Sequence, residues 1–255
     1  MYTLYVIPGS HACRGAMLML RHKRLPYRRV DIVTLLHPLA VRLYGFPASA
    51  ERRSVGPRQG FGLRIGDFLG TVPALAADGG RVSSNHDIAR FLDARHPERP
   101  LLPADPEQRR AVEEAERWAN GPLQMESRRI LLGAGASDPS AYGRIGANGR
   151  MGYLLYRSAR LRTLLIPIVA RVFSVDAAAD RRLVARLPEL LDQVDAWIAE
   201  GVIGGDEPNA ADLMVAPCLA LILYRPELRP LFEGRPALEL VDRLLPDPAQ
   251  AAPQS

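Results

Sequence analysis

The first 33 residues alternate the signals of a strand, a helix and a second strand, and this order constrains the fold more than any other feature of the sequence. "TLYVI" (3–7) is rich in β-forming residues and ends at a Pro-Gly turn. "CRGAMLMLRHK" (13–23) has apolar residues at helical spacing, and Pro26 ends that helix. "YRRVDIV" (27–33) alternates like a second strand. Because a helical crossover joins parallel strands, the sequence predicts an α/β unit here.

A hairpin and a capped helix follow in the same part of the chain. "TVPALAADGGRV" (71–82) predicts two strands joined by a turn at its Asp-Gly-Gly. "SSNHDIARFLDARH" (83–96) begins with capping residues and continues with apolar residues at helical spacing. Strand and helix signals are therefore mixed up to about residue 96.

The remainder of the chain is predicted to be helical throughout. Asp105 as N-cap and Pro106 at the first helical position open a long helical pattern that runs to residue 132. Further helices are expected around 151–173, over 181–201 and over 209–224. The last is nearly all apolar and hence buried, and it begins with Asn209 and Asp212 in a variant capping box.

A proline-rich stretch, "PERPLLPADP" (97–106), separates the region of mixed strands and helices from the helical remainder. We expect a first domain over 1–96, a linker over 97–106 and an all-helical domain over 107–255.

Composition indicates a cytoplasmic protein without a membrane partner. The chain has 255 residues, of which 47% are hydrophobic, enough for a sizeable core. Its start lacks the charged leader of a signal peptide, and its apolar stretches fall short of the ~20 residues that span a bilayer. The two cysteines, Cys13 and Cys218, make no disulfide framework, which suits a reducing compartment.

The net charge of +5 does not by itself indicate nucleic-acid binding. Of the 33 basic residues, 32 are arginine and only Lys23 is lysine. We attribute this preference for arginine to a GC-rich genome. The charge is concentrated in the first 95 residues, where a small anionic ligand would explain it as well as a polymer. Because no basic helix is interleaved with aromatic residues, we expect no nucleic-acid partner.

Ser10-His11-Ala12-Cys13 has the spacing of a Cys-x-x-Cys redox motif with serine in the first position. Ser10 alone is also what a simple helix cap would look like. Cys13, in the first turn of a helix, could form mixed disulfides, but Ser10 supplies no partner thiol, and a small packing residue is the simpler interpretation. His11 beside Ser10 lacks the orienting acid and oxyanion hole of a hydrolase. Cys218 is expected in the core, and no cluster has metal-ligand spacing.

Four stretches, in the right order, resemble the cytosolic glutathione transferases. They are "LYVIPGSHACRGAMLMLRHKRLPY" (4–27), "TVPAL" (71–75), "SSNHDIARFLDARHPERPLLPADPEQR" (83–109) and "LDQVDAWIAEGVIGGDEPNAADLMVAPCL" (191–219). The resemblance implies an α/β thioredoxin-like N-terminal domain followed by an all-α helical C-terminal domain. It also implies a serine-type, bacterial-like enzyme of detoxification, a homodimer that transfers glutathione to a small hydrophobic electrophile.

The resemblance assigns site residues one by one. Ser10 falls at the catalytic position, where its hydroxyl would favour the glutathione thiolate. Pro73, expected to be cis, would present the backbone of Val72 to the tripeptide. Ser84 and Asn85 stand where the family has an acid followed by serine, so we expect them to hold the γ-glutamyl group, although the missing acid departs from the pattern.

A second departure is an extended segment over 34–70, longer than is common in the family. Its stretch 48–68 is rich in arginine and glycine, and we expect a solvated insertion there. Two alternatives to a transferase remain open. One is a non-catalytic binding or scaffold protein with the same fold, and the other is a glutathione-dependent thiol-disulfide oxidoreductase that uses Cys13.

Overall fold

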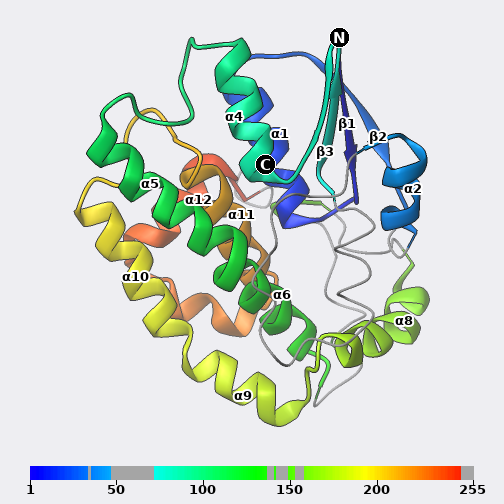
Figure 1. Ribbon diagram of the computed structural model, residues 1–255. Helices are drawn as coiled ribbons and strands as arrows, with labels where there is room; N and C mark the ends of the chain where they lie inside the picture. Colours follow the sequence, from blue (N-terminus) through cyan, green and yellow to red (C-terminus); the bar gives the residue numbers. More distant parts are fainter. Residues whose placement is uncertain (34–35, 47–71, 137–140, 142–148, 153–157, 248–255) are drawn as a thin grey trace, which may run out of the picture.

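The structure is a computed structural model, and it describes residues 1–33, 36–46, 72–136, 141, 149–152 and 158–247 (Figure 1). The predicted insertion 48–68 therefore lies outside the described residues. The elements of the first part are β1 (Tyr2–Val6), α1 (His11–His22), β2 (Tyr27–Asp31), α2 (His37–Leu43), β3 (Ala74–Ala77), β4 (Gly80–Ser83) and α4 (Asn85–Arg95).

These strands form a four-stranded mixed sheet in the order β2-β1-β3-β4. β1 and β2 are parallel, as a helical crossover requires, and β3 pairs antiparallel with both β1 and β4. The turn between β3 and β4 uses Gly79, whose φ of +81° favours glycine. Figure 1 shows α1 and α4 on one side of the sheet and α2 on the other. The strands and the hairpin predicted from the sequence are confirmed.

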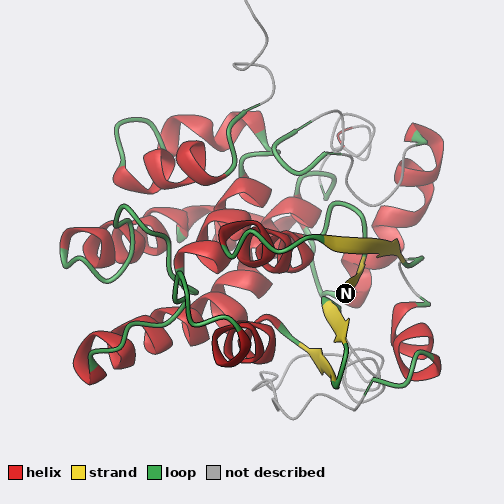
Figure 2. Ribbon diagram, turned by 90° about the horizontal axis from the view of Figure 1, so that it is seen from above, coloured by secondary structure: helices red, strands yellow, loops and turns green. Residues whose placement is uncertain are grey.

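The second part of the chain is helical, as Figure 2 shows with all strands gathered in one region of the molecule. Its elements are α5 (Pro106–Trp118), a π-helical turn (Ala119–Leu123), α6 (Gln124–Gly133), α8 (Ala159–Val172), α9 (Ala177–Ala185), α10 (Leu187–Ala199), α11 (Asp212–Ile222), a 3₁₀ segment (Pro226–Leu231) and α12 (Pro236–Leu244).

Helix α11 is the centre of this part and is buried along its whole length. Its start confirms the predicted capping box. The backbone N–H of Asp212 donates to the Asn209 side chain at 3.2 Å, and the N–H of Asn209 donates back to the Asp212 carboxylate at 2.9 Å. A Cβ at Gly15 of α1 would come within 2.6 Å of the Met214 sulfur, so the two parts of the chain meet at a close crossing of α1 and α11. One hydrophobic cluster accordingly contains residues of both parts.

Two helices predicted as continuous are divided by proline. The long pattern up to residue 132 is interrupted by the π-helical turn, which contains Pro122. The pattern over 181–201 ends one helix at Ala185 and begins another at Leu187, with Pro188 in the first turn of the second. Proline has no N–H to donate, so each of these residues removes one hydrogen bond of the helical ladder. The loss does not always end a helix, because α8 and α11 continue past Pro167 and Pro217. Within the part of the chain that the structure describes, no helix is long and apolar enough to cross a membrane.

Candidate functional site

Ser10 is the N-cap of α1, as the sequence predicts. Its backbone has φ −70° and ψ 124°, and its Oγ accepts a hydrogen bond from the N–H of Cys13 at 3.4 Å. The N–H of Ser10 donates to the carbonyl of Ile7 at 3.1 Å, which fixes the turn between β1 and α1. Since Oγ acts as an acceptor toward the backbone, its own proton can be donated to a ligand.

Cys13 lies one turn into the same helix, with its thiol turned inward. The side chain is 1% exposed, and Sγ accepts a hydrogen bond from the N–H of Ile7 at 3.4 Å. Burial raises the pKa of the Cys13 thiol to about 11. Cys218 is buried in α11, and burial raises its pKa to about 12. Both thiols are therefore protonated near neutral pH, which disfavours thiol exchange through either one.

The peptide bond between Val72 and Pro73 is cis, as the resemblance implied. The β1–β3 register pairs Tyr5 with Ala74, so Pro73 lies beside the end of β1, where the chain turns toward Ser10. The carbonyl of Pro73 accepts a hydrogen bond from the N–H of Ser84 at 3.1 Å. The turn that leads to Ser10, the cis-Pro73 and the start of α4 at Ser84 therefore meet at one end of the sheet.

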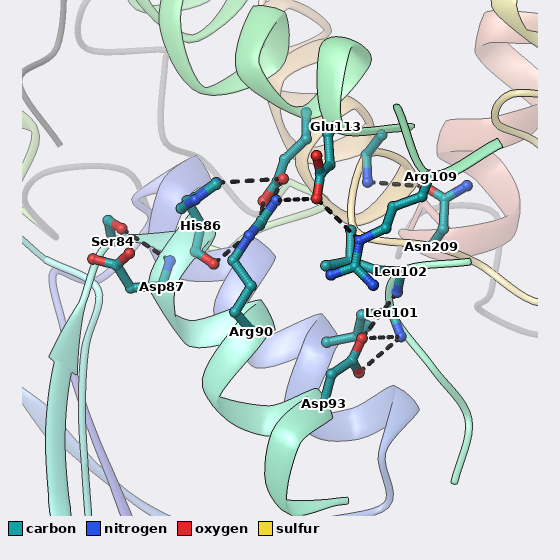
Figure 3. Close-up of polar contacts among 12 residues, drawn as sticks. Ser84, His86, Asp87, Arg90, Asp93, Leu101, Leu102, Arg109, Glu113 and Asn209 are labelled. Atoms are coloured by element: carbon teal, nitrogen blue, oxygen red, sulfur yellow. Dashed lines mark hydrogen bonds and ion pairs between the residues drawn. The ribbon is translucent and has the colours of Figure 1, made fainter. Parts of the chain in front are cut away.

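Ser84 caps α4 in an unusual backbone conformation. Its φ is +79° and its ψ is 150°, a region populated almost only by glycine. The side chain is buried, and Oγ accepts a hydrogen bond from the N–H of Asp87 at 3.2 Å (Figure 3). Strain of this kind is typical of ligand-binding positions, because the surrounding structure must over-determine it.

The side chain of Asn85 joins the starts of the two helices. Its Nδ2 donates to the carbonyl of Ala12 at 2.9 Å, and the residue is 3% exposed. The cap of α4 is therefore Ser84, while the amide of Asn85 is committed to the first turn of α1. As a consequence the N-termini of α1 and α4 lie at the same end of the sheet, where the N–H groups of a first turn suit an anion.

The charges around the start of α1 favour the same kind of ligand. The guanidinium groups of Arg29 and Arg128 act on the Cys13 thiol to lower its pKa, although burial outweighs them. Arg29 belongs to β2, where it is ion-paired with Asp31, and Arg128 belongs to α6. The positive end of the α1 dipole adds to this field.

A buried ion cluster connects α4 to α5 (Figure 3), and no sequence pattern predicted it. Glu116 of α5 is 0% exposed, and Arg90 of α4 donates from Nη1 to both of its carboxylate oxygens, at 2.9 and 2.8 Å. Arg90 also contacts Glu113 at 3.2 Å, and His86 lies 3.5 Å from Glu116. The cluster holds the helix that Ser84 caps against the second part of the chain.

The structure thus brings together all the residues expected to bind glutathione: Ser10, Val72, Pro73, Ser84 and Asn85. Trp118 of α5 packs edge-on against Trp197 of α10, at the side of the helical part. Among the side chains that the structure describes, no group of three or more His, Cys, Asp or Glu could hold a metal ion.

Comparison with known proteins identifies the fold. No model of a protein family matches the sequence, and no curated protein is recognisably similar to it. Among solved structures, a glutathione S-transferase from Sinorhizobium meliloti gives a TM-score of 0.61 at 16% identity, over 98% of this chain and 90% of that one.

Two further solved structures are similar over nearly their full length. A glutathione S-transferase from Ceriporiopsis subvermispora in complex with glutathione gives a TM-score of 0.59 at 16% identity, over 95% of this chain and 96% of that one. Glutathione transferase F2 from Populus trichocarpa gives 0.58 at 15% identity, over 95% and 92%. The chain therefore has the glutathione S-transferase fold, a thioredoxin-like domain followed by an all-α part, as its sequence implied.

Proposed function

We propose that this chain binds glutathione at the shared end of the sheet and transfers its thiolate to a small electrophile, with Ser10 as the catalytic residue. The observation that carries the proposal is the meeting of three features: a serine hydroxyl at the start of α1, the cis-Pro73 beside it, and the strained cap Ser84 at the start of α4. The similar structure from C. subvermispora holds glutathione, which supports the same ligand here.

In this proposal the tripeptide pairs with the backbone of Val72 like an added strand. Its γ-glutamyl carboxylate lies at the N-terminus of α4, near the hydroxyl of Ser84. Because Nδ2 of Asn85 donates to the carbonyl of Ala12, the backbone N–H of Asn85 and its buried Oδ1, which has no partner among the described residues, remain for the ligand. Asp87, whose N–H bonds to Ser84, is the nearest acid in α4 to the γ-glutamyl amine and takes the place of the acid that this sequence lacks.

Ser10 acts by stabilising the attacking group. Its hydroxyl donates a hydrogen bond to the glutathione sulfur, and the thiol proton leaves to solvent. A hydrogen bond to a charged group is worth about 1.5–3 kcal/mol, which lowers a thiol pKa by roughly 1–2 units from about 8.5. The thiolate fraction at neutral pH then rises from a few per cent to about half. The thiolate forms a C–S bond with the electrophilic carbon, and the leaving group departs with the electron pair of the broken bond.

The test is calorimetric titration with reduced glutathione near neutral pH, in buffers of different ionisation enthalpy, so that proton release is measured with binding. We expect the wild type to release about half a proton per glutathione bound, equal to the gain in thiolate fraction, and Ser10→Ala to bind while releasing much less. S-methylglutathione, which has no thiol proton, should bind to both without proton release.

Ser158→Ala is the matched control. Ser158 caps α8 through a hydrogen bond of the same 3.4 Å length, so this variant loses a helix cap but no site residue. It should release as many protons as the wild type. If the wild type does not bind millimolar glutathione, the transferase proposal fails, and a non-catalytic binding protein becomes the better description. If instead Cys13→Ala abolishes activity with glutathione disulfides while Ser10→Ala does not, the oxidoreductase alternative holds.

We also propose three finer points, which the resemblance to glutathione transferases supports. The protein forms a homodimer, which light scattering on the purified chain would show. It acts in the cytoplasm, where reduced glutathione is available. The acceptor is a small molecule with a hydrophobic part, as in detoxification.

A further inference from the structure

Arg14 is a partly buried cation for which the described part of the chain provides no hydrogen-bond acceptor. It lies in α1, and its Nε is buried without a hydrogen-bond partner. No hydrogen bond or ion pair joins its side chain to another of the described residues. Buried polar groups in folded proteins are almost always paired. Other arginines of low exposure in this chain follow that rule and contact carboxylates: Arg90, Arg150 and Arg225.

The groups around Arg14 do not neutralise it. Burial lowers the pKa of the Arg14 guanidinium, and the positive charges of Arg21 and Arg29 act in the same direction. Its opposing neighbours are two phenols, Tyr27 and Tyr224. A phenol is neutral at physiological pH, so Arg14 remains a cation without a counter-charge from these neighbours.

Arg14 is placed to act at the thiol site. It follows Ser10 by four residues, and its N–H donates to the carbonyl of Ser10 at 2.9 Å, so the two residues share one face of α1. Side chains in a helix lean toward its N-terminus, which directs the guanidinium over the turn that begins at Ser10.

Its neighbours place this guanidinium on the side of Ser10 away from α4. Tyr27 is in β2, at the edge of the sheet opposite β4. Tyr224 follows α11 and is fixed by two hydrogen bonds, donating to the carbonyl of Gly152 at 2.6 Å and accepting from the N–H of Met151 at 3.0 Å. Arg14 therefore lies between the β2 edge of the sheet and the end of α11, away from the start of α4 where the γ-glutamyl group is proposed to bind.

We propose that Arg14 binds a carboxylate of the acceptor substrate, so that the electrophile this site favours is an anion. The inference rests on the proposed function, because it assumes that glutathione occupies the site beside Ser10. A guanidinium suits a carboxylate because its N–H groups form two parallel, charge-assisted hydrogen bonds. The positive charge of Arg128 acts at the start of the same helix and favours an anionic ligand, whereas Arg29 is paired with Asp31.

The test uses glutathione conjugates that differ by one carboxylate, so that it needs no turnover. S-benzylglutathione is compared with its 3- and 4-carboxybenzyl analogues by calorimetry on the wild type, Arg14→Met and Arg14→Lys. We expect the wild type to prefer a carboxylated conjugate, and Arg14→Met to reduce this preference by about tenfold to hundredfold. Arg14→Lys, which keeps the charge but not the paired donors, should retain part of it.

Arg21→Met is the matched control, because Arg21 is exposed on the same helix and its removal changes the net charge equally. Its preference should stay within about twofold of the wild type, since screened surface charges contribute little. If Arg14→Met keeps the wild-type preference, the inference is wrong. It is also wrong if both conjugates lose affinity equally in Arg14→Met, because Arg14 would then hold the glycine carboxylate of glutathione. If neither glutathione nor S-benzylglutathione binds the wild type, the proposed function itself fails.

Discussion

Removing the guanidinium of Arg90 should destabilise the protein far more than removing a comparable arginine at the surface. The carboxylate of Glu116 is 0% exposed, and Arg90 donates to both of its oxygens at 2.9 and 2.8 Å. In Arg90→Met this carboxylate would stay buried without its counter-charge. Breaking a buried pair in this way costs about 3–5 kcal/mol. For a chain of this size, 1 kcal/mol corresponds to about 2–4 °C, so the melting temperature should fall by roughly 6–20 °C.

Arg109 provides the control within the same cluster. It contacts Glu113 at 3.2 Å across one helical turn, but its side chain is 44% exposed. An exposed pair of this kind is worth about 0.3–0.5 kcal/mol, so Arg109→Met should lower the melting temperature by no more than about 2 °C. The double variant Arg90→Met/Glu116→Met should recover most of the lost stability, because it removes the unpaired charge along with its partner.

The assay is urea unfolding followed by circular dichroism, with calorimetric melting on the same samples. Two results would refute the reasoning. One is a loss in Arg90→Met no larger than that in Arg109→Met. The other is a double variant as unstable as the single one, since packing rather than charge would then explain the loss.

Three further predictions concern stability. Asp212→Ala should lower the free energy of unfolding by about 2–5 kcal/mol, because the backbone N–H groups of Gly204 and Asn209 lose their acceptor. Urea unfolding measures this loss, and an unchanged stability would mean that water replaces the carboxylate. Gly15→Val should cost at least about 1–3 kcal/mol, because a Cβ there lies 2.6 Å from a sulfur of α11; an unchanged melting temperature would contradict the close helix crossing. Stability should also fall as pH rises above about 9, because burial raises the folded-state pKa values of Cys13, Cys218 and Tyr224 to about 11, 12 and 12. The unfolded chain already releases the two thiol protons from about pH 9, and the phenol proton from about pH 10. Each group contributes a slope of about 1.4 kcal/mol per pH unit, so Cys13→Ala should flatten the curve, and a flat wild-type curve to about pH 10.5 would show that the thiols are accessible.

The features that the sequence predicted correctly depend on signals between near neighbours. The β-α-β start, the hairpin at Gly79 and the capping box of Asn209 and Asp212 each involve residues only a few positions apart. Such signals act on the backbone directly, through turn conformation and unpaired N–H groups, so tertiary contacts rarely override them. The cis-Pro73 was predicted by resemblance alone, since proline permits the cis bond but does not require it.

The features that the sequence did not predict join residues far apart. The amide of Asn85 bonds to a carbonyl 73 residues earlier, and Arg90 meets Glu116 across 26 residues. Neither pair has a periodic or local signal, because any polar residue on a helix suggests solvent until its partner is known. The proline-divided helices were missed for another reason, since each side of the break keeps the same helical period.

Asn85 departs from the family pattern, and its hydrogen bond to the carbonyl of Ala12 gives that departure a structural role. From the sequence, an amide in place of serine at the start of α4 weakens the case for glutathione recognition. In the structure this amide bonds to the carbonyl of Ala12, in the turn that Ser10 caps, so it links the two helix N-termini that the proposed site requires. Ser84, with its φ of +79°, then remains as the side chain at the start of α4 that can meet the ligand. In the proposed function, recognition at the start of α4 would rest on Ser84 and the backbone N–H groups, and Asn85 would position them.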